Sequence, residues 1–196
     1  MNRKRIAWIF LAIASTIICS CNLNNRPGYY ISLTGPTQGT SYHITYESYD
    51  SVDYQGEIDS LLRHFDLSLS TYEPASVISR INRDEPEVEL NDYFIECFKA
   101  SERIFIESEG AFDITVAPVV NAWGFGFTEK ADPDSIMIDS LLQFVGMNHI
   151  RIENDRIVKD FTGIMLDVNA IAQGYAVDVV SEYFESNAIP NYLVEI

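Results

Sequence analysis

The sequence predicts a single α+β domain, in which helices flank a mixed sheet. Hairpin signals are mixed with helical periodicity along the chain, a pattern that is typical of α+β folds. With 196 residues, of which 47% are hydrophobic and 21% are charged, the chain is long enough to bury one well-formed core. It contains neither internal repeats nor low-complexity tracts.

The first twenty residues have the features of an export signal. Three basic residues near the start precede an apolar run, residues 6–18, that is short for a membrane span. We expect residues 1–20 to be a signal peptide. The end of this segment together with Cys21 resembles a bacterial lipoprotein cleavage box, which predicts a palmitate-bearing lipid on Cys21 and an exported, membrane-anchored protein. A signal peptide without lipidation and a membrane-anchoring helix are the alternatives.

Cysteine content and charge narrow the possible partners. Residues 21–29 are polar with a proline and form the expected tether, after which Cys97 is the one remaining cysteine. No internal disulfide can therefore form, and apolar neighbours at helical spacing predict that Cys97 is buried. Loss of the three basic residues of the signal takes the formal charge from −16 to near −19. Nucleic acid is not an expected partner, because its phosphates need basic surface.

The elements of the N-terminal half follow from period and turn residues. We expect strands over residues 30–33 and 41–46, joined by a turn at Gly35–Pro36. Apolar residues at helical spacing predict a helix over 57–65. Residues 68–82 are interpreted as a loop.

The C-terminal half shows the same mixture, and its last residues are apolar. Because a domain rarely ends inside an apolar strand, we expect residues 30–196 to be the N-terminal part of a larger domain. The predicted elements are a helix capped by Asn91 and ended by Gly110, a helix over 134–145, a hairpin of 149–153 and 156–159 around Asn154–Asp155, a strand over 165–168, a helix over 170–186 and a buried strand over 192–196.

Residues 110–126, GAFDITVAPVVNAWGFG, are apolar but have features that a core strand avoids. Pro118 cannot donate to a sheet ladder, and glycines beside aromatic rings let a backbone approach a flat ligand. An aromatic plug in a tight turn of the core is the alternative. The candidate binding residues here are Asp113, Thr115, Trp123, Gly124, Phe125 and Gly126.

Residues 166–178, LDVNAIAQGYAVD, predict a strand end followed by a helix that begins with small residues. Small side chains expose the N–H groups at a helix start, which can hold phosphate. One glycine does not make a dinucleotide fingerprint, and the Gly-Lys-Ser/Thr of a P-loop is missing. Asp167 and Asp178 either cap and orient this turn or face a metal ion or substrate.

The loop over residues 70–82 carries Tyr72 ahead of Glu73–Pro74. An extended backbone before proline is suited to present the tyrosine ring at a cleft, and a merely exposed tyrosine is the alternative. Gly39–Thr40 precede the strand over 41–46. These loops are able to converge on one planar, phosphate-bearing ligand. In an acidic protein, main-chain N–H groups or a bound cation must neutralise an anionic ligand.

Taken in this order, the segments resemble the ApbE family of flavin transferases. The resemblance implies an enzyme that binds FAD with Mg²⁺ and transfers FMN, as a phosphoester, to a Thr or Ser hydroxyl of an acceptor flavoprotein, with release of AMP. The implied acceptor is a subunit of a respiratory or redox complex. An FAD pyrophosphatase and a flavin-binding lipoprotein without chemistry are the alternatives.

The resemblance also implies roles for individual residues. Ala170 matches the position whose main-chain carbonyl ligates magnesium, and the rest of the metal site is expected after Ile196. Gln38 and Asn169 depart from the family, which frequently has methionine and a glycine or serine there. The residues that match the FAD-binding cleft are Gly39, Thr40, Tyr72, Asp113, Thr115, Trp123, Gly124, Phe125, Gly126 and Gln173. No catalytic base is identified, and the histidines expected to be structural or solvated are His43, His64 and His149.

Overall fold

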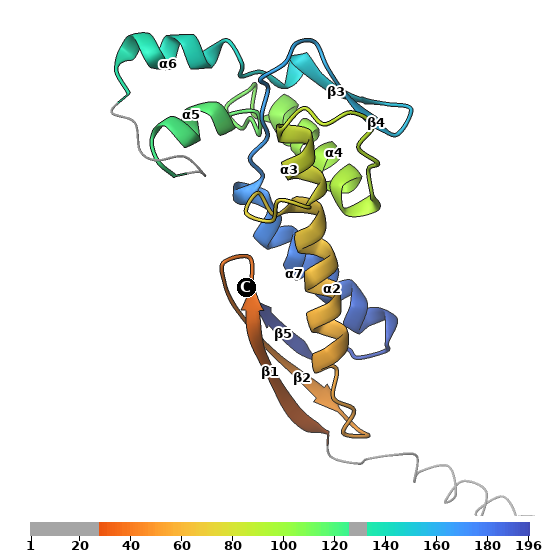
Figure 1. Ribbon diagram of the computed structural model, residues 1–196. Coiled ribbons are helices and arrows are strands. Elements are labelled where there is room, and N and C mark those ends of the chain that lie inside the picture. Colours follow the sequence, from red (N-terminus) through yellow and green to blue (C-terminus); the bar gives the residue numbers. More distant parts are fainter. Residues whose placement is uncertain (1–27, 126–132) are drawn as a thin grey trace, which may run out of the picture.

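The computed structural model describes residues 28–125 and 133–196. The expected signal peptide, the proposed lipid site at Cys21, most of the tether and Gly126 lie outside these residues. A three-stranded sheet lies at one end of the described chain, two long helices run beside it, and smaller elements gather at the other end (Figure 1). This arrangement confirms the predicted α+β class. Within the described residues, no helix has the length and apolar character needed to cross a membrane.

The sheet is antiparallel, with the strand order β1 (Tyr29–Thr37), β2 (Thr40–Ser48) and β5 (Tyr192–Glu195). The β1–β2 hairpin turns at Gln38 and Gly39, whose φ angles are 49° and 76°. Two central residues with positive φ are typical of a tight hairpin turn whose twist matches its strands.

The predicted turn at Gly35–Pro36 is wrong. Both residues lie within β1, where they pair with Tyr42 and Ser41 of β2. The Tyr42 ring packs over Gly35, and a side chain built there would come within 2.6 Å of the ring. Proline is tolerated in this place because β1 is an edge strand of the described sheet.

Two long helices, α2 (Gln55–Leu69) and α7 (Asn169–Ser186), pack against the sheet and each other. Their apolar faces form the core together with the inner face of β2. Ile58 of α2 is fully buried there, and the rings of Tyr46 and Phe184 stack with their centres 5.2 Å apart. Helix α2 confirms the periodicity predicted over 57–65 and extends beyond it at both ends, and α7 matches the predicted helix over 170–186 except that it begins one residue earlier.

The third core helix, α4 (Asp92–Glu107), contacts both long helices. It begins at the predicted cap, where the Asn91 side-chain oxygen accepts from the N–H of Phe94 at 3.1 Å. Cys97 lies on its buried face, and burial raises the pKa of this thiol to about 12. The prediction that Cys97 is a buried apolar residue is confirmed.

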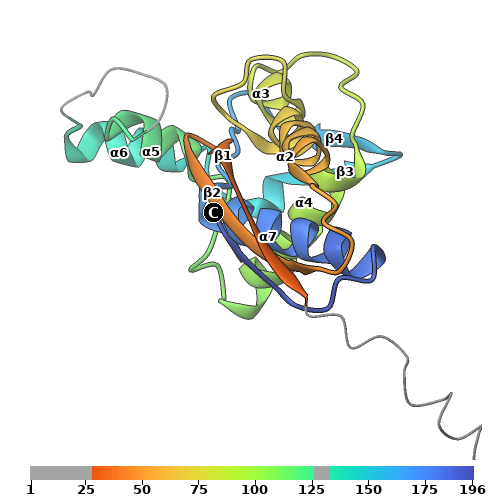
Figure 2. The same ribbon diagram turned by 90° about the horizontal axis from the view of Figure 1, so that it is seen from below.

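The smaller elements complete the other end of the domain. Helices α5 (Ala117–Ala122) and α6 (Ser135–Leu142) lie side by side at one edge of the molecule (Figures 1 and 2). The hairpin of β3 (Ile150–Glu153) and β4 (Arg156–Lys159) turns at Asn154–Asp155, as predicted, with positive φ at both residues. The remaining short elements are α3 (Val77–Asn82) and the 3-10 helix η1 (Met147–His149).

Three more expectations about secondary structure need correction. The predicted loop over 68–82 contains the end of α2 and all of α3, a helix of six residues that is too short to show a clear period. The predicted strand over 165–168 is a single parallel bridge from Met165 to Val116. Strand β5 forms, but it is not buried, since Leu193 on its outer face is 58% exposed.

Candidate functional site

The three segments singled out in the sequence meet in space through Asn82 and Leu166. The side-chain amide of Asn82 donates to the Leu166 carbonyl at 2.8 Å and accepts from the Leu166 N–H at 2.7 Å. On the other side, the N–H of Asp167 donates to the carbonyl of Ile114 at 2.7 Å. One side chain therefore joins the 70–82 loop to the 166–178 segment, which in turn pairs with the 110–126 segment.

The loop that carries Tyr72 is fixed by two serines. The hydroxyl groups of Ser76 and Ser79 donate to the Ser70 carbonyl at 2.6 and 3.3 Å. Ser76 also caps α3, because its side-chain oxygen accepts from the N–H of Ser79. Tyr72 is thus held on an ordered backbone while 64% of it stays exposed, which leaves its ring accessible to a ligand.

Tyr72 lies at the rim of a pocket of about 220 Å³ between the β1–β2 turn, the end of α2 and the start of α7. Gln173 also lines it, as do Gln38 and Asn169, the two residues at which the sequence differs from the pattern it resembles. The lining residues are Gln38, Phe65, Asp66, Leu69, Ser70, Tyr72, Asn169, Ala172 and Gln173. The structure therefore brings Tyr72 and Gln173 together, next to the turn that contains Gly39.

The walls of this pocket hold hydrogen-bonding groups that the described protein does not use. Four buried side-chain atoms lack a partner among the described residues: Thr37 Oγ1, Gln38 Nε2, Asp66 Oδ1 and Thr71 Oγ1. Gln38 and Asp66 line the pocket, Thr37 directly precedes Gln38, and Thr71 lines a neighbouring pocket that shares Tyr72. Buried polar atoms without partners are rare and costly, so this concentration indicates a ligand site.

Asp66 was missed by the sequence analysis. Burial raises the pKa of its carboxyl group, and a hydrogen bond from the Gln38 main-chain N–H partly offsets this rise. A signal was present in the sequence. Asp66 lies four residues after Leu62 and three before Leu69, so it falls on the apolar face of α2, where a carboxylate needs a reason to be.

Asp113 and Thr115 occupy a different place. One Asp113 oxygen accepts from the N–H and the hydroxyl group of Thr115, at 2.8 and 2.5 Å, and the other accepts from the N–H of Met147 at 3.2 Å. The Thr115 oxygen accepts from the N–H of Gly146 at 2.6 Å. The two side chains hold the turn before η1, and neither lines the Tyr72 pocket. Their role in cofactor binding stays a prediction.

The aromatic turn after α5 is exposed. Trp123 and Phe125 are 47% and 76% exposed, and Gly124 between them has a φ of 78°. Neither aromatic residue lines the Tyr72 pocket. Pro118 lies in the first turn of α5, where its missing N–H costs nothing. Contact of this turn with a cofactor also stays a prediction.

The start of α7 is organised by Asp167, whose carboxylate accepts from the N–H of Asn169 at 2.8 Å. This contact favours the structural reading of Asp167. Ala170 lies in the exposed first turn of the helix. In the part of the chain that is described, no three His, Cys, Asp or Glu residues are grouped to hold a metal ion. The described residues do not by themselves fit a complete magnesium site, and the ligand role of Ala170 stays a prediction.

The histidines are placed away from the Tyr72 pocket. His43 and His64 are exposed on β2 and α2. The Nδ1 atom of His149 lies 3.3 Å from the Asp160 carboxylate, and its ring contacts that of Phe161 with the ring centres 5.1 Å apart. These surroundings agree with the expectation of structural or solvated histidines.

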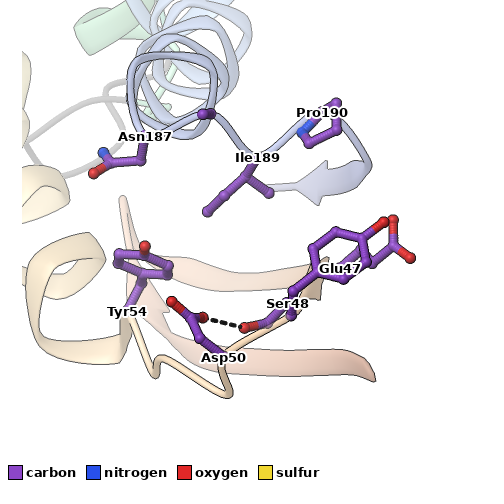
Figure 3. Close-up of a pocket in the computed structure, with 9 residues that line it drawn as sticks. Glu47, Ser48, Asp50, Tyr54, Asn187, Ile189 and Pro190 are labelled. Atoms are coloured by element: carbon purple, nitrogen blue, oxygen red, sulfur yellow. Dashed lines mark hydrogen bonds between the residues drawn. The ribbon is translucent and has the colours of Figure 1, made fainter. Parts of the chain in front are cut away.

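A larger pocket, of about 600 Å³, lies beside the far end of β2 (Figure 3). It contains none of the predicted site residues. Its polar groups are paired, since Ser48 donates to Asp50 at 3.0 Å and Asn191 donates to Glu47 at 2.6 Å. The nine-residue strands β1 and β2 separate it from the Gln38–Gly39 turn by about 30 Å. The smaller pocket is therefore the better candidate.

The sequence profile of the ApbE family matches residues 38–196, which include every described residue of this pocket. The chain belongs to the ApbE family. It is 36% identical to the FAD:protein FMN transferase of Vibrio cholerae, over 96% of this chain and 58% of that protein. It is 29% identical to the protein of the same name from Haemophilus influenzae, over 99% of this chain and 59% of that protein.

Solved structures of the family have the same fold. The flavin transferase ApbE from Vibrio cholerae superposes with a TM-score of 0.81 at 36% identity, over 87% of this chain and 58% of that one. The Pseudomonas stutzeri flavinyl transferase ApbE, in its apo form, gives a TM-score of 0.78 at 32% identity, over 89% and 58%. The chain spans a little under three fifths of the length of these ApbE proteins.

Proposed function

We propose that the protein is an FAD:protein FMN transferase. One observation carries the proposal: in a chain of the ApbE family, Tyr72 and Gln173 line a pocket whose walls contain buried polar atoms without partners. A ligand with an aromatic face and a polar edge would satisfy both features.

The proposed reaction moves FMN from FAD to a Thr or Ser hydroxyl of an acceptor flavoprotein. The hydroxyl oxygen forms a bond to the FMN phosphorus, while the bond from that phosphorus to the bridging oxygen of the pyrophosphate breaks. AMP leaves with the bridging oxygen, and the hydroxyl proton passes to solvent. A subunit of a respiratory or redox complex is the proposed acceptor.

The described residues would bind and orient FAD in this reaction. The Tyr72 ring offers a face for the isoalloxazine, and the serines that fix its loop reduce the entropy lost on binding. The start of α7 lines the same pocket through Asn169, Ala172 and Gln173, and the positive end of the helix dipole would favour phosphate there. This positive end suits a chain with a formal charge of −16, which has few basic residues to spare.

Magnesium dependence is part of the proposal because the resemblance implies it. The ion would neutralise pyrophosphate charge, with the Ala170 carbonyl as one ligand. Removal of divalent ions with EDTA should abolish transfer, and added Mg²⁺ should restore it. Full activity in EDTA would refute the requirement.

The proposal is tested by incubating the intact protein with FAD, Mg²⁺ and an acceptor domain. Transfer gives an acceptor that stays yellow after denaturation and gains the mass of FMN, with one AMP released per label. FMN and AMP without labelled acceptor would show a pyrophosphatase instead. FAD that is bound but unchanged would show a flavin carrier without chemistry.

We also propose that the protein is exported and anchored through a lipid on Cys21, so that it meets its acceptor at the membrane. The support is the order of basic, apolar and cysteine residues at the start of the sequence. Mass spectrometry of the membrane fraction should find an acylated peptide that begins at Cys21. Cys21→Ala should remove the acylation, and an unmodified Cys21 in the natural protein would refute the anchor.

A further inference from the structure

Two unpartnered atoms in the Tyr72 pocket have opposite hydrogen-bonding character. Asp66 Oδ1 can only accept when its carboxyl group is ionised, and Gln38 Nε2 can only donate. Both residues line the same pocket, yet these two atoms are not bonded to each other. A fixed acceptor and a fixed donor therefore stand in the wall without partners in the described protein.

Asp66 lies beside the β1–β2 turn. The main-chain N–H of Gln38 interacts with the Asp66 carboxylate and lowers its pKa, whereas burial, the larger effect, and the charge of Glu73 both raise it. Oδ1 has no hydrogen-bond partner among the described residues, so it is the oxygen with capacity for a ligand.

We propose that Asp66 and Gln38 recognise the imide edge of the isoalloxazine ring, with Asp66 Oδ1 accepting from flavin N3–H and Gln38 Nε2 donating to a neighbouring flavin carbonyl. This inference rests on the proposed function, because it concerns the same site. It assigns to both residues a part in specificity, in addition to the face offered by Tyr72.

The two unpartnered atoms of the pocket match one half of this edge. The imide presents an N–H beside a carbonyl oxygen, so it needs one acceptor next to one donor. The pocket offers one acceptor in Asp66 and one donor in Gln38, and the Tyr72 ring at the same pocket suits the flat face of the isoalloxazine. The amino group of adenine beside a ring nitrogen presents a similar pair, and binding of AMP therefore serves as the comparison in the test. Such a hydrogen bond gives specificity, because a site that accepts a hydrogen bond from a ligand N–H binds a ligand without that N–H much more weakly.

The test uses riboflavin and 3-methylriboflavin, which lacks the N3–H, with the intact protein and without metal or acceptor. We expect the unmodified protein to bind riboflavin at least about tenfold more tightly, since a hydrogen bond to a charged group is lost and the methyl group meets the carboxylate. Equal affinities for the two flavins would overturn the inference.

Asp66→Asn sharpens the test. The Gln38 N–H should hold the amide oxygen of Asn, which turns the amide NH₂ toward the flavin N–H and places two donors face to face. Riboflavin affinity should fall about tenfold while 3-methylriboflavin affinity changes less than about twofold. Asp50→Asn, which removes the same charge from the far pocket, should preserve the preference for riboflavin.

Gln38→Met separates the two contacts. It removes the donor with little change in size, so both flavins should bind about fivefold more weakly and their ratio should stay unchanged. If Asp66→Asn instead weakens the binding of AMP and leaves the affinity for both flavins unchanged, Asp66 contacts adenine and the inference fails. Discrimination between the flavins without FMN transfer would refute the proposed reaction alone, while transfer without discrimination would refute this inference alone.

Discussion

Two aspartates in this domain differ in how fully the protein satisfies their carboxylates. Asp113 accepts three hydrogen bonds, from the Thr115 N–H, the Thr115 hydroxyl and the Met147 N–H. Asp66 has an oxygen that is buried and unpartnered, beside an unpartnered Gln38 amide. The protein itself supplies hydrogen-bond donors to both oxygens of Asp113, whereas one oxygen of Asp66 can still accept a hydrogen bond from a ligand.

The comparison shows that residue type alone does not assign a function. Asp113 belongs to the segment that looked most like a binding motif, whereas Asp66 lies in a helix that looked purely structural. What distinguishes them is how many hydrogen bonds the protein itself supplies to each carboxylate. Four substitutions test the contrast between them.

The largest effect is expected for Asp113→Ala. It leaves the Thr115 and Met147 donors without their acceptor, and we expect the free energy of unfolding to fall by about 2–3 kcal/mol. Urea denaturation measures the loss. Asp113→Asn keeps one oxygen and should lose less. Unchanged stability with a large loss of flavin affinity would place Asp113 in the binding site instead.

Tyr72→Ala tests the pocket from its rim. The ring is exposed, so the fold should remain intact, but flavin affinity should fall by about 1 kcal/mol, or about fivefold, because one stacked face is lost. Fluorescence titration with riboflavin measures it. Tyr72→Phe is the matched control and should bind nearly as the unmodified protein does. Unchanged affinity in Tyr72→Ala would remove this residue from the site.

Asp66→Asn should stabilise the ligand-free protein slightly. The pKa of Asp66 is raised in the folded state, so ionisation is easier in the unfolded chain, and stability falls as the pH rises through the range between the ordinary and the raised pKa. Removing the charge should raise the free energy of unfolding by up to about 1 kcal/mol at pH 7, a modest figure because solvent screens a half-buried group. The gain should disappear in denaturation curves below the ordinary pKa. A loss of stability at pH 7 would contradict this account.

The smallest effect is expected for Asp50→Asn. Asp50 lines the larger pocket, and an Asn oxygen can still accept from Ser48. Riboflavin affinity should change by less than about twofold, because this pocket lies about 30 Å from the Tyr72 pocket. A strong loss of binding would move the flavin site to the far end of the sheet.

The sequence predicts features that depend on neighbouring residues better than features that depend on distant ones. The Asn91 cap and the Asn154–Asp155 turn were predicted because each is decided within a few residues. The turn predicted at Gly35–Pro36 was wrong, because glycine and proline favour turns but are also tolerated in an edge strand of a sheet. The convergence of Tyr72 and Gln173 on one pocket came from the family resemblance, since no local pattern brings them together.

The Asn82 side chain joins two segments that lie 84 residues apart in the sequence, because its amide group pairs with the main-chain N–H and carbonyl of Leu166. A chain that crosses a membrane with its N-terminal end first would form the first hairpin and α2 early, but the Tyr72 pocket would lack one wall until the start of α7 had followed. The ligand site would therefore be completed only after most of the chain had been exported, so that a partly exported polypeptide would have little ability to bind flavin.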